Sequence, residues 1–225
     1  MTKKIIFAIV AGCMASASFA STTSDFNSQA AQCTTNGGVY VEGTVVANGE
    51  TDSEDSPATI IDTIGHQLQY NGNYIFTPQN APVMMNHTHF KVKITNTNIS
   101  GNDNFKVGSI IDVAADDIFT NDADTTEKYN KDNNTNEVPQ SLKNNISDNQ
   151  SISLCGLNYD NVEGSHDSFN TVSGAGIHFV HTIGSETPVP GKVSNGWVET
   201  FQASNGENIY SDNLEGNAEY AGDFN

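Results

Sequence analysis

The sequence predicts an all-β fold, most simply a single β-sandwich or jelly-roll-like domain with a long acidic loop rich in Asn and Asp. Short runs of alternating apolar and polar residues recur along the chain, and clusters of Gly and Asn separate them. No stretch keeps apolar residues at helical spacing for three turns. Alternation with a period of two is typical of strands that bury one face, and Gly and Asn between such runs favour turns. Together these patterns indicate an all-β domain.

The expected strands begin at Val39 and end at Tyr210. Asn71-Gly72 is a hairpin signal between two of them, because Asn-Gly readily adopts left-handed turn geometry. In chain order, the expected strands cover residues 39–46, 59–64, 67–70, 74–77, 83–95, 105–113, 151–157, 177–183, 197–201 and 209–210. Residues 114–150 form a polar insertion that is too long for an ordinary connection. A disordered insertion, a calcium-ordered loop and a loop with a short helix near Ile118 all fit this segment.

The first twenty residues have the three parts of a secretory signal peptide. Lys3 and Lys4 precede a short apolar run, and small residues then lead to Ala20. The apolar run is too short to span a bilayer as a helix. Cleavage after Ala20 would remove residues 1–20, whereas lipidation of Cys13 is the alternative. Both predict export to a secreted, extracellular or cell-surface location, and the periplasm also stays open.

The rest of the chain is expected to form one domain. After cleavage, residues 21–32 would be a small, polar and flexible leader, and residues 33–225 would be a single β domain. Cys33 and Cys155 are the cysteines left in this part. In an oxidising compartment two thiols most simply form one disulfide. Closing so long a loop stabilises a fold by roughly 4–5 kcal/mol in chain-entropy estimates.

The charge balance excludes several classes of partner. The chain has 9 Lys+Arg against 27 Asp+Glu, with no Arg, and its formal net charge is −18 at pH 7. Such a surface repels nucleic acid and anionic lipid, and it attracts divalent cations. We therefore expect no nucleic-acid partner, and because no second long apolar run follows the first twenty residues, we expect no membrane span. Self-association and a surface glycan are the partners that this composition leaves open.

Two histidines are candidate metal ligands. Alternate residues of a strand share a face, so His87 and His89 would lie on one side, about 7 Å apart, together with Lys91 and Lys93. Two imidazoles at this spacing suit zinc, and the thioethers of Met84-Met85 would favour copper. Against a metal, the two lysines would repel a cation and no neighbouring Cys or carboxylate completes the set. The same stripe also fits a basic ridge that docks an acidic segment of this chain or of a second subunit.

Calcium is the one cofactor that the acidic loop suggests. Asp122, Asp124 and Glu127 offer alternating oxygen ligands, and Asp132 to Glu137 offers more. Calcium takes several oxygens from such runs, but neither run matches the EF-hand loop. A solvated acidic loop is the alternative interpretation.

No catalytic motif accompanies these features. His166-Asp167 lies between two serines, but no Gly-x-Ser-x-Gly elbow is present. His178 and His181 would point to opposite faces of one strand, with His181 in the core. Zinc-protease, Walker-type and dinucleotide fingerprints are absent from the sequence. We therefore expect that the protein is not an enzyme.

The sequence therefore predicts a secreted or cell-surface, non-enzymatic β-sandwich protein with a structural role in adhesion, extracellular matrix or filament assembly. Two binding functions stay open as alternatives. One is a calcium-dependent glycan-binding module, for which Tyr70, Tyr74, Trp197 and Tyr210 are candidate sugar platforms near turns. The other is a periplasmic copper- or zinc-binding protein that would use His87 and His89.

Overall fold

The computed structural model describes residues 23–46, 60–67, 69–70, 73–74, 84–116, 120, 139–160, 175–178, 180–182, 193–205 and 207–216. For those of these residues that lie from 60 to 87, it describes the backbone alone. The described elements, in chain order, are α1 (Thr23–Thr35), β1 (Val39–Val46), β2 (Ile60–Gln67), β3 (Gln69–Tyr70), β4 (Asn73–Tyr74), β5 (Met84–Thr97), the 3-10 turn η1 (Asp103–Phe105), β6 (Ile110–Asp116), α3 (Gln140–Asn145), β7 (Ser151–Asp160), β8 (Ala175–His178), β9 (Trp197–Ser204) and β10 (Glu207–Tyr210). The predicted all-β class is confirmed.

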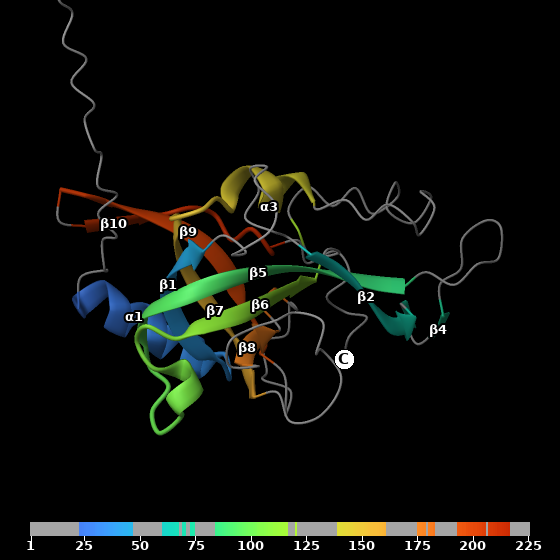
Figure 1. Ribbon diagram of the computed structural model, residues 1–225, viewed down its shortest axis with the longest axis horizontal. Coiled ribbons are helices and arrows are strands. Elements are labelled where there is room, and N and C mark those ends of the chain that lie inside the picture. The colour runs from blue at the N-terminus through green and yellow to red at the C-terminus, as the bar shows by residue number, and fades with distance from the viewer. Residues whose placement is uncertain are drawn as a thin grey trace, which may run out of the picture.

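Five of these strands close into a barrel (Figure 1). β1 pairs with β5, β5 with β6, and β6 with β8, while β7 pairs with both β8 and β1 and so completes the ring. The β6–β8 pair is parallel, through the partners Asp112↔Gly176 and Val113↔Ile177, and the other four pairs are antiparallel.

The described strands form a closed barrel and not the predicted sandwich or jelly roll, because β7, the last strand of the ring, also pairs with its first strand β1. Residues 151–156 of β7 pair with β1, and residues 157–160 pair with β8. β1 bends where it follows the ring, since its register against β5 shifts between Glu42 and Gly43. A Cβ atom at Gly43 would collide with the Val92 side chain. A bulge beside a glycine is a common device for turning a strand around a closed sheet.

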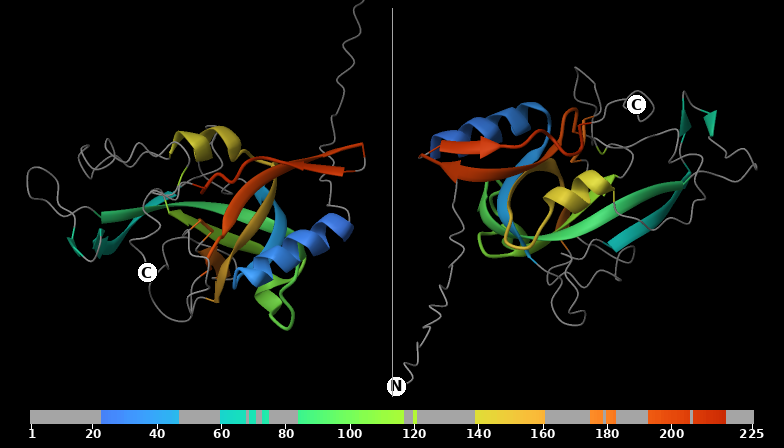
Figure 2. Two further views of the ribbon diagram at one scale, coloured as in Figure 1. Left: turned by 180° about the vertical axis from the view of Figure 1, so that it is seen from behind. Right: turned by 90° about the horizontal axis from the view of Figure 1, so that it is seen from above.

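The remaining strands extend the barrel. β2 pairs with the first half of β5, and β3 pairs with β4 as a small separate ladder that matches the expected hairpin. β9 pairs with residues 152–155 of β7, and β10 pairs with β9. We call β9 and β10 the β9–β10 arm. It runs out from the barrel alongside α1 in the right-hand view of Figure 2.

The barrel interior is the main hydrophobic core. On β5, the alternating residues Phe90, Val92 and Ile94 are buried in it, as the sequence predicts. Leu142 and Ile146, from α3 and the residue after it, join the same cluster. Residues 114–116 belong to β6, and α3 is packed on the core. The polar insertion predicted for 114–150 therefore has structured ends, and its acidic middle lies outside the described residues.

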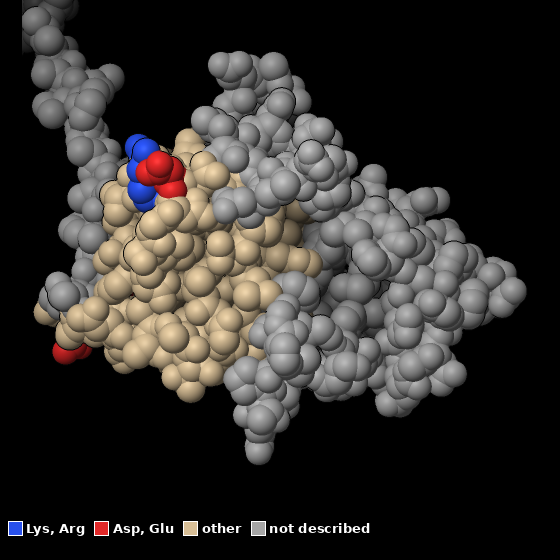
Figure 3. All heavy atoms as spheres, turned by 90° about the horizontal axis from the view of Figure 1, so that it is seen from below, with Lys and Arg blue, Asp and Glu red and all other residues tan. Residues whose placement is uncertain are grey.

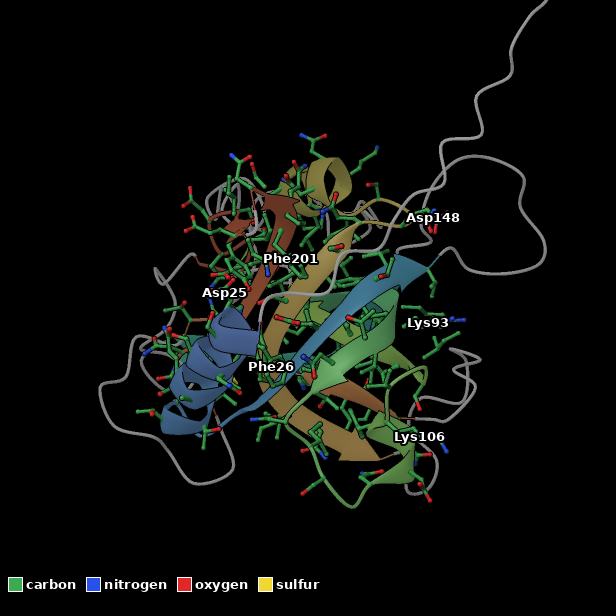
Figure 4. The ribbon with its side chains drawn as sticks, turned by 90° about the vertical axis from the view of Figure 1, so that its left-hand side faces the viewer. Asp25, Phe26, Lys93, Lys106, Asp148 and Phe201 are labelled. Carbon is green, nitrogen blue, oxygen red and sulfur yellow. A yellow bond between two sulfur atoms is a disulfide. The ribbon has the colours of Figure 1, made fainter. Side chains whose placement is uncertain are left out.

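The helix α1 covers the outer side of β1 and β7, where a second apolar cluster lies. Phe26, Ala30 and Cys33 of α1 join Tyr40 and Trp197 there, and Figure 4 shows Phe26 at the junction of α1 with the strands. The rings of Phe26 and Tyr40 are 5.3 Å apart. The flexible leader predicted for residues 21–32 is therefore wrong from Thr23 onward, because α1 begins there and buries one side.

The predicted disulfide is confirmed. Cys33 and Cys155 are bonded, with their Cα atoms 5.6 Å apart, and both side chains are fully buried. The bond fastens the end of α1 to the middle of β7. None of the helices in the described part of the chain is long and apolar enough to span a membrane.

Candidate functional site

The outer face of the barrel carries a buried polar cluster on β5, β6 and β7. Because Phe90 and Val92 point into the core, the alternate residues His89 and Lys91 lie on the outer face. His89 is nevertheless buried, with an exposed fraction of only 4%. Lys93, farther along the same row, is exposed and points away from the barrel in Figure 4.

His89 is held by a carboxylate from the next strand. Its Nδ1 lies 2.7 Å from Oδ2 of Asp112, and both side chains are buried. The Tyr159 hydroxyl on β7 donates a hydrogen bond of 2.8 Å to the same oxygen. We call His89, Asp112 and Tyr159 the outer triad. A carboxylate only accepts hydrogen bonds, so an ionised Asp112 fixes a proton on Nδ1 and leaves Nε2 of a neutral ring as its basic nitrogen.

A glycine makes room for the tyrosine in this cluster. Tyr159 and Asp112 are both register partners of Gly176 on β8, which lies between their strands. A Cβ atom at Gly176 would collide with the Tyr159 ring and hydroxyl. The missing side chain therefore lets Tyr159 cross β8 and reach Asp112. Burial and the neighbouring Asp112 carboxylate both raise the pKa of Tyr159, so its hydroxyl stays protonated and remains a donor.

The fold also pairs the second histidine with two acidic residues in register, which the sequence did not indicate. His87 pairs with Asp62 of β2 on one side and with Asp116 of β6 on the other. Register partners in antiparallel strands occupy the same face, with Cα atoms roughly 4.5–5.5 Å apart. We call Asp62, His87 and Asp116 the β5 row. It lies one step along the strand from His89.

The two lysines of this row count less against a metal site in the fold than they do in the sequence. Lys91 is the register partner of Asp112, so a carboxylate lies opposite it. Lys93 is one step farther from the histidines and is exposed. No group of three or more metal-ligating residues is gathered among the side chains that the structure describes. A complete site on this face would therefore draw on the β5 row, which the structure describes by its backbone alone.

The other residues singled out in the sequence divide into two groups. The predicted calcium ligands Asp122, Asp124 and Glu127 lie outside the described residues. So do His166-Asp167 and the acidic run 132–137. His181 is buried, as expected, although it follows β8, which ends at His178.

Two of the proposed sugar platforms are engaged in packing. Trp197 is 5% exposed, and its indole N–H donates a hydrogen bond of 3.0 Å to Oγ of Ser153. The ring of Tyr210 packs at 5.3 Å from the ring of Phe201. The structure does not describe the side chains of Tyr70 and Tyr74.

Comparison with known proteins gives no relative from which a function could be transferred. No family model, curated protein or solved structure matches the chain. The site must therefore be interpreted from its own chemistry.

Proposed function

We propose that the protein is an exported, non-enzymatic barrel that binds a zinc or copper(II) ion on the outer face of β2, β5 and β6. The observation that carries this proposal is the buried contact between His89 Nδ1 and Asp112 Oδ2. Metal-bound histidines almost always donate their other ring N–H to a carboxylate or carbonyl, which fixes the ring and raises its basicity. Asp112 has this role for His89, and Tyr159 holds Asp112 in place.

The ligand set is supported by the β5 row. His87 lies about 7 Å from His89 along the strand, and carboxylates flank it in register on β2 and β6. Imidazole nitrogens with one or two carboxylate oxygens suit zinc and copper(II). The negative net charge of the chain favours capture of a cation.

The position on the barrel supports a binding role as well. Five-stranded Greek-key barrels of the OB type bind ligands across the outer face of their second and third strands. Counted along this chain, β5 and β6 are the second and third strands of the barrel, and they carry His89 and Asp112. This support comes from connectivity alone, and the choice of a metal comes from the side chains.

Calorimetric titration of the purified chain with Zn²⁺ and Cu²⁺ tests the proposal. We expect binding of one ion, and we expect His89→Ala and His87→Ala each to remove most of it. Asp112→Asn should lower affinity about 10–100-fold, because it removes the group that orients the imidazole. His178→Ala, a half-buried histidine on β8, is the matched control and should bind as the parent does. Binding unchanged by both His89→Ala and His87→Ala would reject the proposal.

A structural role in adhesion, extracellular matrix or filament assembly is the second candidate function. It is favoured by Ile209, whose exposed fraction is 63% and which lies on β10, the strand that ends the sheet among the described elements. An exposed terminal strand is a template for pairing with another chain. Figure 3 shows the molecule from below, and in the described part of this face the charged side chains lie only at the margin.

Light scattering coupled to size-exclusion chromatography tests this second candidate. Concentration-dependent association that Ile209→Lys abolishes would support it, because a charge on a terminal strand prevents edge pairing. Lys143→Ala on α3 is the control, since its side chain is exposed and belongs to another element. A chain that stays monomeric at high concentration would rule out this route to assembly. A calcium-dependent glycan-binding function stays a proposal that rests on residues outside the description.

A further inference from the structure

The β9–β10 arm is attached to the barrel by a short stretch of β9. Residues 197–200 of β9 pair with residues 152–155 of β7, whereas residues 201–204 pair with β10 alone. The outer half of the arm therefore has no barrel partner among the described strands. Weakening of this four-residue attachment would loosen the arm, which Tyr210 of β10 also holds through Tyr40.

Glu199 lies in this attachment and is poorly accommodated there. Its register partner on β7 is Ser153, whose Oγ already accepts the indole N–H of Trp197. One carboxyl oxygen of Glu199, Oε2, is buried and has no hydrogen-bond partner among the described residues. An ionised carboxylate with an unsatisfied buried oxygen carries a desolvation cost that a neutral carboxyl group largely avoids.

In the described part of the chain, the ionisable groups that act on Glu199 or share its row offer no positive charge. From the segment after β10, Asp212 acts on it electrostatically. On the other side of Ser153, Glu42 of β1 lies in the same row. The Tyr40 hydroxyl donates a hydrogen bond of 2.9 Å to Oε1 of Glu42. Tyr210 of β10 interacts with Glu42, Tyr40 and Asp25 of α1. Among the described residues, ion pairs join His89 to Asp112 and Lys106 to Asp103, and neither pair involves Glu199.

Burial first, and then repulsion by Asp212, raise the pKa of Glu199 from 4.5 to about 7. A carboxyl group whose pKa is higher in the docked state than in the open state binds its proton more tightly when docked. Docking is therefore strongest at a pH below about 4.5. It weakens as the pH rises toward about 7 and stays at its weakest above that value.

We propose that the β9–β10 arm is a pH-controlled element, which is docked on β7 while Glu199 is protonated and is loosened when Glu199 ionises. The device is independent of the proposed metal site, because Glu199 and the outer triad lie on different strands. Among the described residues, they make no contact with each other. It would make the surface around β7 and β10 differ between mildly acidic and neutral surroundings of an exported protein.

The single tryptophan of the chain reports this motion directly. Trp197 lies two residues before Glu199, inside the attachment, and is 5% exposed. As the pH is raised from about 5 to about 8, we expect its emission to shift to the red and its quenching by acrylamide to increase, with both changes levelling off above about pH 7. Far-UV circular dichroism should stay constant, because the barrel itself remains folded.

Three variants make the test decisive. Glu199→Gln, which cannot ionise, should keep the docked emission throughout this range. Asp212→Asn should move the transition to lower pH, because it removes the repulsion while leaving Glu199 in place. Glu207→Gln, an exposed carboxylate on β10 of the same arm, should keep the parent profile. A parent chain whose Trp197 emission and quenching do not change with pH would overturn the proposal. The same transition in Glu199→Gln would overturn it as well.

Discussion

Asp112 and Glu199 are both carboxylates on the outer side of the barrel, and their surroundings are opposite. Asp112 accepts hydrogen bonds from a histidine on the neighbouring strand β5 and from a tyrosine on β7, which reaches it across β8. Glu199 has a buried oxygen without a hydrogen-bond partner, and the group that acts on it electrostatically is another acid. A carboxylate with donors on two sides holds its neighbours in place. One with a buried, unsatisfied oxygen binds a proton more tightly and becomes sensitive to acidity.

The glycine beside one carboxylate and the helix beside the other explain how each environment is built. Gly176 opens a path across β8 for the donor that satisfies Asp112. Around Glu199, α1 and the arm bury the row formed by Glu42, Ser153 and Glu199 without adding a base. The first region is suited to holding a ligand in fixed geometry, and the second is suited to changing conformation. Three changes to the chain should separate these two roles. Their expected effect on the free energy of unfolding decreases from the disulfide to Asp112 and then to Glu199.

Removal of the disulfide should have the largest effect and should fall on the Glu199 side. Cys33→Ser combined with Cys155→Ser should lower the free energy of unfolding by about 4–5 kcal/mol, since the bond closes a loop with a sequence separation of 122 residues. Urea denaturation measures this loss. Because α1 covers Tyr40 and Trp197, the emission of Trp197 should also shift to the red in the native state. A loss below about 1 kcal/mol would mean that the bond adds little to the docking of α1.

Loss of the Asp112 carboxylate should have the next largest effect. Asp112→Ala leaves the buried His89 Nδ1 and the Tyr159 hydroxyl without their acceptor, which should cost about 2–4 kcal/mol. Thermal or urea unfolding checks this value. Tyr159→Phe is the milder companion, because it removes one hydrogen bond and should cost about 1 kcal/mol. Equal effects of the two variants would indicate that His89 does not depend on Asp112.

Neutralisation of Glu199 should have the smallest effect and the opposite sign. Glu199→Gln should stabilise the fold by about 1–2 kcal/mol above pH 7, a value reduced for the partial exposure of this side chain. The folded pKa lies above the unfolded one, so the parent chain loses stability as the pH rises from about 4.5 to about 7, whereas the variant does not. Urea titrations at several pH values should therefore give curves that separate with rising pH. Parallel curves would contradict an unsatisfied carboxylate at this position.

The sequence predicted the local features of the fold well. β1 begins and ends where the alternation around Tyr40 indicates, and the buried face of β5 follows the spacing of Phe90, Val92 and Ile94. The disulfide followed from counting thiols in an oxidising compartment. These features depend on neighbouring residues or on composition, so one sequence is sufficient to predict them.

Long-range pairing was the part that local patterns did not reveal. The ring closes through β1 and β7, whose partners such as Tyr40 and Cys155 are more than a hundred positions apart. The α1 helix was missed because its buried face consists of Phe26, Ala30 and Cys33 among many small polar residues, which gives a weak apolar pattern. On β8, Gly176 obscured the strand pattern, and the strand begins at Ala175, before its expected start.

The sequence revealed only part of the candidate site, for the same reason. His87 and His89 share a row because they are two residues apart, which any strand would give. Their carboxylates come from β2 and β6, and only register decides that Asp62 and Asp116 flank His87. Alternation in β6 does place Asp112 on the outer face, opposite the buried Ile111 and Val113. That signal indicated the face, although it did not indicate the partner.

The bond between Cys33 and Cys155 also determines how the protein would carry mechanical load. Tension applied at the two ends of the chain passes through the sulfur atoms from Cys33 directly to Cys155. The covalent loop between them contains β1, β5, β6 and α3, so the proposed metal ligands on β2, β5 and β6 lie off the covalent path of the force, whereas Tyr159 of the outer triad follows Cys155 and lies on it. At about 3.5 Å per residue, the loop keeps roughly 400 Å of chain from extending while the bond is intact. A chain pulled at its ends would thus yield outside this loop, at α1 or at the elements after Cys155 such as the β9–β10 arm.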